Sequence, residues 1–151
     1  MEQFYSWSAA RIHGAAYSRS KARIHDDLSS VQSMKPNQLV ILSKTFAVDT
    51  INLCEQIKER KKASGIVNQL LRSGTSIGAN IHEANYAASK ADFVNKLQIA
   101  LKECYETDYW LDIFHTAEIV TDEEYKNLYA QCSKLRTLLV ASINTAKKDS
   151  Q

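Results

Sequence analysis

The segment Gly74-Thr75-Ser76-Ile77-Gly78 has the spacing of a G-x-S-x-G nucleophile motif, in which the serine would attack an acyl carbon. That chemistry requires a strained turn between a β-strand and a helix, because the turn exposes the serine hydroxyl. The residues on both sides of this segment follow a helical pattern of apolar positions, and no strand pattern precedes it. We therefore interpret Gly74 and Gly78 as helix-packing residues and predict no catalytic residue.

Carboxylates and histidines could instead hold two metal ions inside a helical bundle, where Glu residues and Glu-x-x-His pairs point inward. The candidates are Glu83, Glu103, Glu106 and the spaced pair Asp112-x-x-His115. A second spaced pair on another helix is missing, and pairing of the acids with Arg72 or Lys96 is the simpler interpretation. We predict no metal site and no cofactor, and a di-metal carboxylate enzyme remains the third alternative.

The composition favours an all-α protein. The chain has 151 residues, 44% of them hydrophobic, but only four glycines and one proline to punctuate strands and hairpins. Cys54, Cys104 and Cys132 each occupy an apolar position of a different predicted helix, so we expect three reduced core thiols. No apolar run reaches the roughly 18 residues of a membrane span. We expect a cytoplasmic protein without a membrane partner.

The chain divides into two regions of different character. Residues 1–36 show no sustained period and carry five basic against three acidic side chains, so we predict a flexible N-terminal extension. Residues 37–149 are predicted to form a four-helix bundle domain, with 14 basic and 14 acidic side chains. Binding to nucleic acid would therefore need an excess of cations on at least one face of this neutral body.

Four amphipathic segments are expected over residues 37–60, 64–88, 89–114 and 121–147. The third and fourth begin at the capping patterns Ser89-x-x-Asp92 and Thr121-x-x-Glu124. Short links between the segments force neighbours to run in opposite directions. The sequence therefore predicts an up-down-up-down antiparallel four-helix bundle.

Two features predict that this bundle assembles with copies of itself. The third segment is apolar on most sides, Trp110 included, which suggests contacts with neighbouring subunits as well as within the chain. Gly74 and Gly78 either form a strip of small residues that allows another backbone to come close or mark a kink in the helix. We predict a homo-oligomer whose interface includes Gly74, Gly78 and Trp110.

Three stretches of sequence resemble a known family: residues 69–84 (QLLRSGTSIGANIHEA), 89–103 (SKADFVNKLQIALKE) and 106–111 (ETDYWL). They look like the bacterial 23S rRNA-intervening-sequence proteins, small four-helix bundle proteins often encoded within intervening sequences of ribosomal RNA genes. The likeness covers residues 37–148. The family is similar in fold to the accessory variability determinant proteins of diversity-generating retroelements, which form pentameric barrels and bind nucleic acid and a reverse transcriptase.

The resemblance implies a cytoplasmic homo-oligomer, most simply a homopentamer, without enzymatic activity. Arg72, Lys90, Lys96 and Lys102 match basic positions of the family pattern, so we predict that they contact RNA or DNA phosphate. Tyr105, Tyr109 and Trp110 could stack on bases, although their helical spacing favours packing.

Two functions of different classes remain open. One is an accessory RNA- or DNA-binding protein, and the other is an interaction scaffold that holds a protein partner without binding nucleic acid. The scaffold would use the end surfaces or the central channel of the oligomer. Salt-sensitive affinity for RNA would distinguish the two.

Overall fold

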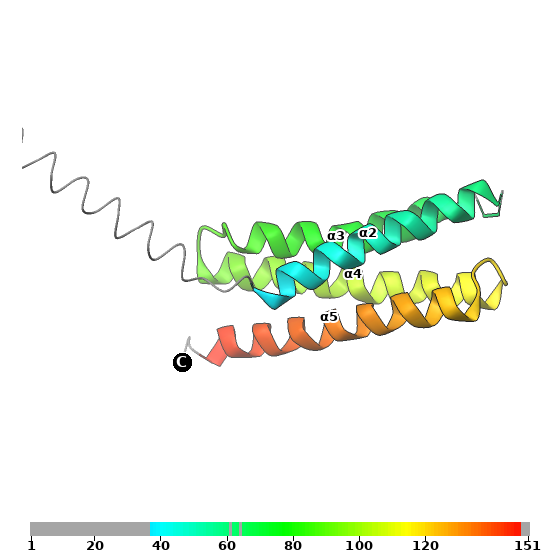
Figure 1. Ribbon diagram of the computed structural model, residues 1–151. Coiled ribbons are helices and arrows are strands. Elements are labelled where there is room, and N and C mark those ends of the chain that lie inside the picture. The colour runs from blue at the N-terminus through cyan, green and yellow to red at the C-terminus, as the bar shows by residue number, and fades with distance from the viewer. Residues whose placement is uncertain (1–36, 61, 64, 149–151) are drawn as a thin grey trace, which may run out of the picture. The chain divides into compact units, whose positions relative to one another are not determined.

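The computed structural model describes residues 37–60, 62–63 and 65–148, and Figure 1 shows four long helices in this part of the chain. They are α2 (Gln38–Glu59), α3 (Val67–Ala84), α4 (Lys90–Thr116) and α5 (Asp122–Lys148). No strand occurs among these residues, which confirms the predicted all-α class. The predicted flexible extension over residues 1–36 lies outside the described residues.

Each helix packs against two others: α3 lies between α2 and α4, and α5 contacts α4 and α2. Two contacts set the register of each helix pair. For α3, these are Cys54 with Val67 and Thr50 with Gly74 against α2, and Glu83 with Lys96 and Ser73 with Thr107 against α4. For α5, they are Cys104 with Cys132 and His115 with Asp122 against α4, and Asp49 with Gln131 and Arg60 with Glu124 against α2. In every pair of helices the residue numbers rise along one helix and fall along the other. Neighbouring helices therefore run in opposite directions.

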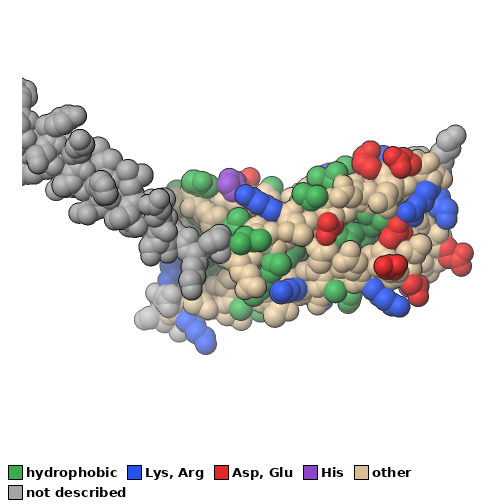
Figure 2. All heavy atoms as spheres, in the orientation of Figure 1, with side chains coloured by type: hydrophobic (Ala, Val, Ile, Leu, Met, Phe, Trp, Pro, Cys, Tyr) green, Lys and Arg blue, Asp and Glu red, His purple; other side chains and the backbone are tan. Residues whose placement is uncertain are grey.

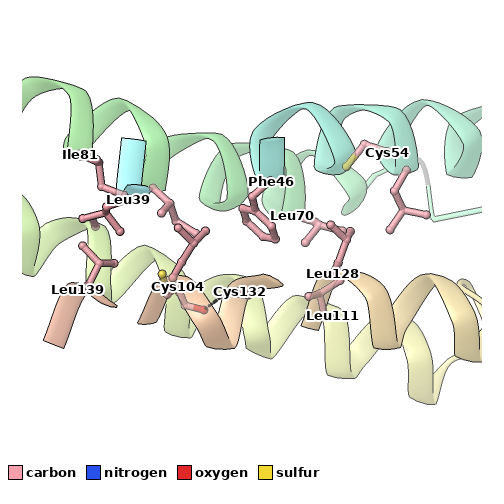
Figure 3. Close-up of a cluster of buried hydrophobic side chains, with 14 of the residues drawn as sticks. Leu39, Phe46, Cys54, Leu70, Ile81, Cys104, Leu111, Leu128, Cys132 and Leu139 are labelled. Atoms are coloured by element: carbon pink, nitrogen blue, oxygen red, sulfur yellow. Dashed lines mark hydrogen bonds between the residues drawn. The ribbon is translucent and has the colours of Figure 1, made fainter. Parts of the chain in front are cut away.

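The core lies between the four helices, and Figure 3 shows its side chains meeting there. Phe46, Leu70, Leu111 and Leu139 are completely buried and come one from each helix. Burying a side chain of this size contributes about 1.5–3 kcal/mol to the free energy of unfolding, so the buried apolar side chains supply the main stabilisation of the bundle.

The three cysteines are buried free thiols, as predicted. Burial raises the pKa of Cys54 to about 11. Contact with Cys104, together with burial, raises the pKa of Cys132 far above its ordinary value. Because the thiolate is the reactive form, the thiols of Cys54 and Cys132 are inert at neutral pH.

Gly74 and Gly78 let α3 approach α2 of the same chain. A Cβ at Gly74 would lie 2.7 Å from Thr50 Cγ2, which is too close, whereas a Cβ at Gly78 would lie 3.4 Å from the Ser43 carbonyl oxygen. The prediction of close helix contact is thus explained within one chain. Gly74 is buried there and Gly78 is half-buried, and their part in a subunit interface stays a prediction.

The helix boundaries differ most from expectation around α3, which covers residues 67–84 instead of 64–88. Residues 65 and 66 form a turn, in which the Ile66 amide donates to the Ala63 carbonyl at 3.0 Å, and the helix begins only at Val67. The helix ends at Ala84, before the predicted residue 88. The Ala88 amide donates to the Asp92 carboxylate at 3.2 Å, so it belongs to the start of α4 and not to α3.

Both predicted capping patterns form. Ser89 Oγ accepts the Asp92 amide at 3.1 Å and begins α4. At α5, Glu124 accepts the Thr121 amide at 2.8 Å while Thr121 Oγ1 accepts the Glu124 amide at 3.3 Å, which is a complete capping box. Glu124 also forms two hydrogen bonds with Arg60, the shorter at 2.6 Å, and so joins the start of α5 to the end of α2.

The two helical glycines should respond oppositely to alanine. Gly74→Ala would force α2 and α3 apart at Thr50, and we expect a net loss of about 1–2 kcal/mol after the gain in helix propensity. Gly78→Ala meets only ordinary contact distances, so it should gain up to about 1 kcal/mol. Urea unfolding measures both. Adding Thr50→Ser, which removes the closest methyl group, should restore Gly74→Ala; equal stability of the two alanine variants would contradict this account.

The Arg60–Glu124 pair should make stability depend on acid pH. Arg60 holds the pKa of Glu124 at about 2, against an ordinary value of 4.5. A lowered folded-state pKa contributes stability above pH 4.5 that is lost as the pH falls from about 5 to about 2. With a discount for solvent screening, we expect Glu124→Gln to remove about 1 kcal/mol at pH 7 and much less at pH 2. Glu55→Gln, at a more exposed pair, is the control and should change stability little at either pH.

Candidate nucleic-acid interface

The charged side chains are divided unevenly between the two ends of the bundle. The end formed by residues 82–98 and 141–148 carries four lysines against two carboxylates. The described residues at the opposite end, within 55–62 and 112–126, carry four basic against seven acidic side chains. Figure 2 shows the acidic side chains gathered toward this second end. We call the first the basic end and the second the acidic end.

Three lysines of the basic end have no ion-pair partner among the described residues. Lys90 is the first residue of α4, and Lys147 and Lys148 close α5; all three are exposed. The fourth, Lys96, bonds Glu83 at 2.5 Å, and this contact raises the pKa of Lys96. Lysines at the end of α5 also offset the negative end of its helix dipole, but that role leaves their ammonium groups accessible.

The four basic residues predicted to bind nucleic acid do not form one surface. Lys90, Lys96 and Lys102 follow each other at six-residue intervals on α4, so each is rotated by about 240° from the last and they point to three sides. Arg72 lies on α3 beside Glu103, and its charge partly counteracts the rise that burial causes in the pKa of Glu103. Only Lys90 and Lys96 belong to the basic end.

Tyr86 is an exposed aromatic side chain of the basic end, and sequence reasoning missed it. It lies in the turn between α3 and α4, is 78% exposed and contacts the His82 ring at 5.3 Å. Lys147 and Lys148 were missed as well, because a last-turn lysine ordinarily signals only a helix end. The signal that could have found Tyr86 is an aromatic residue placed three positions before a helix cap.

The aromatic residues singled out from the sequence lie elsewhere, on α4. Tyr105 lies beneath the Arg136 guanidinium, 5.5 Å from its ring centroid, and Tyr109 packs edge-on against Trp110 at 5.1 Å. Trp110 is half-buried and its indole N–H points to Glu106 at 3.4 Å. Its part in a subunit interface stays a prediction.

The spaced pair considered as metal ligands, Asp112 and His115, is engaged with other side chains. Asp112 accepts the Tyr125 hydroxyl at 2.7 Å, and His115 bonds Asp122 at 2.8 Å and stacks on Tyr125. Across residues 37–60, 62–63 and 65–148, no three His, Cys, Asp or Glu side chains are grouped to hold a metal ion. Ser76 lies within α3, so the G-x-S-x-G segment is helical and lacks the strained turn that a nucleophile requires.

A cleft of about 180 Å³ lies between α2 and α5, toward the acidic end of the bundle. Asp49 and Glu124 line it, but Asp49 accepts from Gln131 at 2.8 Å and Glu124 is bound by Arg60. Its carboxylates thus already have partners. None of the described helices combines the length and apolar content needed to cross a membrane.

Comparison with known proteins identifies the family. The sequence profile described as 23S rRNA-intervening sequence protein matches residues 36–141. The chain belongs to the 23S rRNA-intervening sequence protein family. It is also similar to a crystal structure of a protein with unknown function from the S23 ribosomal protein family of Bacteroides thetaiotaomicron. The two share 44% identity over 70% of this chain and 97% of the other, with a TM-score of 0.66. A search of curated proteins returns no match.

One buried ion pair lies within the segment that carries the family resemblance. Asp108 of α4 is 8% exposed and pairs through Oδ2 with Arg136 of α5, while its Oδ1 is buried without a hydrogen-bond partner. Burying a carboxylate lowers the stability of the fold when one of its two oxygens has no hydrogen-bond partner. The positive charge of Arg136 is therefore needed to offset the cost of burying the Asp108 carboxylate in this protein.

Removing Arg136 should destabilise the protein more than removing the whole pair. Arg136→Met leaves Asp108 buried without a countercharge, and we expect a loss of about 3–5 kcal/mol. Asp108→Leu combined with Arg136→Met should recover most of this, since apolar replacement of a buried pair is often neutral. Urea unfolding of both variants measures the difference, and a loss below about 1 kcal/mol for Arg136→Met would show that the pair is solvated.

Proposed function

We propose that this protein is a non-enzymatic, oligomeric accessory protein that binds RNA through its basic end. The observation that carries the proposal is the group of three exposed lysines without ion-pair partners among the described residues, Lys90, Lys147 and Lys148. Phosphate recognition needs accessible cations with nearby acids neutralised or occupied. At this end Glu83 is bound by Lys96 and Asp92 caps α4, so both acids are occupied.

Family membership supports RNA as the nucleic acid. The family takes its name from intervening sequences of 23S rRNA, and this chain matches its profile over most of the bundle. The three buried thiols suit a reducing compartment, so we place the protein in the bacterial cytoplasm, where such RNA is made.

We further propose that the up-down-up-down bundle assembles as a homo-oligomer, with a homopentamer as the simplest expectation. Support comes from α2, whose outer side exposes Ile41, Val48 and Ile51 at 47%, 54% and 42%. These residues lie within about 80° of rotation on one side of the helix. Exposed apolar residues that share a side favour a contact surface. An oligomer would also present several basic ends to one RNA and raise the overall affinity.

The same apolar residues favour the second candidate, a protein-interaction scaffold without nucleic-acid binding. Apolar docking depends weakly on salt, whereas phosphate contacts release counterions and weaken steeply as salt is raised. The salt dependence of binding therefore separates the two candidates.

The test is RNA binding by native gel or fluorescence anisotropy over a range of salt concentrations. Replacing Lys90, Lys147 and Lys148 by Gln should lower the slope of log affinity against log salt by about 2 and weaken binding at low salt roughly tenfold or more. The same three-charge change at the acidic end, at Lys58, Lys62 and Lys126, is the matched control and should leave the slope unchanged. Equal effects of both triple variants, or binding that does not respond to salt, would refute a phosphate site at the basic end.

A further inference from the structure

Tyr86 differs from the other exposed tyrosines of the described chain in having a largely uncovered ring. Tyr105 and Tyr109 are 56% and 57% exposed, and each is partly covered by a neighbour, Arg136 or Trp110. Tyr125 and Tyr129 stack on each other at 5.4 Å. Tyr86, at 78% exposure, has a ring contact with His82, whose plane is tilted by 60° to its own. A planar ligand therefore has access to the tyrosine ring.

Lys90, Lys147 and Lys148 belong to the same end of the bundle as this ring. Lys90 follows Tyr86 by four residues, so their backbones are at most about 14 Å apart. The contacts of Cys104 with Cys132 and of His115 with Asp122 fix the antiparallel register of α4 and α5. Extending that register to the start of α4 brings the last turn of α5, with its two lysines, to the level of Lys90.

We propose that the basic end binds single-stranded RNA, with an unpaired base stacked on Tyr86 and the adjacent phosphates held by Lys90, Lys147 and Lys148. This inference rests on the RNA-binding function proposed above and adds the class of RNA. Every base has a π-face, so a tyrosine platform accepts an unpaired base of any sequence. In a duplex the bases are already stacked on each other and cannot reach the ring, although the lysines can still contact the phosphates.

The turn between α3 and α4 suits this role physically. Tyr86 follows the end of α3, and its backbone amide is already bonded to the Glu83 carbonyl at 2.9 Å, so the turn is held without help from the side chain. His82, four residues earlier on α3, contacts the tyrosine ring and limits its movement. The ring is therefore held at the surface while contributing little to the core.

The experiment compares a fluorescently labelled single-stranded RNA of about ten nucleotides with the duplex of the same sequence, using the full-length protein. Tyr86→Leu should weaken single-strand binding by about 5- to 150-fold, which corresponds to loss of one stacked base. Binding to the duplex should change less than about twofold, and Tyr86→Phe should bind single strands like the wild type, because the ring is retained. The matched control is Tyr109→Leu, which removes a tyrosine that is 57% exposed and lies away from the basic end.

Two readouts keep this inference separate from the proposed function. The salt slope of Tyr86→Leu should equal that of the wild type, because the slope counts phosphate contacts and not stacked bases. Salt-sensitive binding in which Tyr86→Leu and wild type have the same single-strand affinity would overturn the stacking inference while the RNA function stands. Salt-insensitive or absent RNA binding by the wild type would overturn both. Unchanged thermal melting of Tyr86→Leu confirms that the fold is intact.

Discussion

The close approach of α3 to both of its neighbours is the constraint on which the rest of the bundle depends. Two adjacent small residues in the middle of α3 make it possible: Gly74 lies against Thr50 of α2, and the Ser73 hydroxyl accepts a 3.0 Å hydrogen bond from Thr107 of α4. Successive residues on a helix point about 100° apart, so one side meets each neighbour. A larger side chain at Gly74 would separate the helices and open the apolar layers around Phe46.

Charge is used differently at the two ends, and this difference decides which surface is available to a ligand. α2 and α5 are the most distant in sequence and share the smallest interface, which Arg60 and Glu124 close at the acidic end. There Glu124 also caps α5, so the carboxylate with the most strongly lowered pKa serves the fold. At the basic end the helices meet through the α3–α4 turn instead. The Lys96–Glu83 pair joins α3 to α4 at this end, and the exposed Lys90, Lys147 and Lys148 stay accessible.

Much of the fold could be predicted from the sequence because its signals are local. The capping patterns at Ser89 and Thr121 and the buried positions of the cysteines depend on a few residues and on helical period. The partner of the glycine strip could not be predicted, since the spacing of Gly74 and Gly78 indicates close contact but not which helix supplies it. The same holds for Asp108, whose burial depends on Arg136, 28 positions later in the chain.

The candidate site was less accessible to sequence reasoning than the fold, for a different reason. Basic positions transferred from a family pattern include structural ones, and Lys96 is paired with Glu83. Helical rotation alone separates Lys90 from Lys102 on α4. The basic end joins residues from the α3–α4 turn and from the end of α5, which only the three-dimensional arrangement brings to one level.

A near-neutral bundle can hold RNA only if its few accessible cations act together. One basic end offers the three lysines Lys90, Lys147 and Lys148 and the exposed ring of Tyr86. We expect so small a site to bind RNA with modest affinity at physiological salt. In the proposed homo-oligomer the same end is repeated in every subunit, and each contact after the first becomes intramolecular. Affinity then grows with the number of subunits that one RNA can reach. The apolar side of α2 and the basic end would thus serve one function, the first by assembling copies and the second by contacting the strand they share.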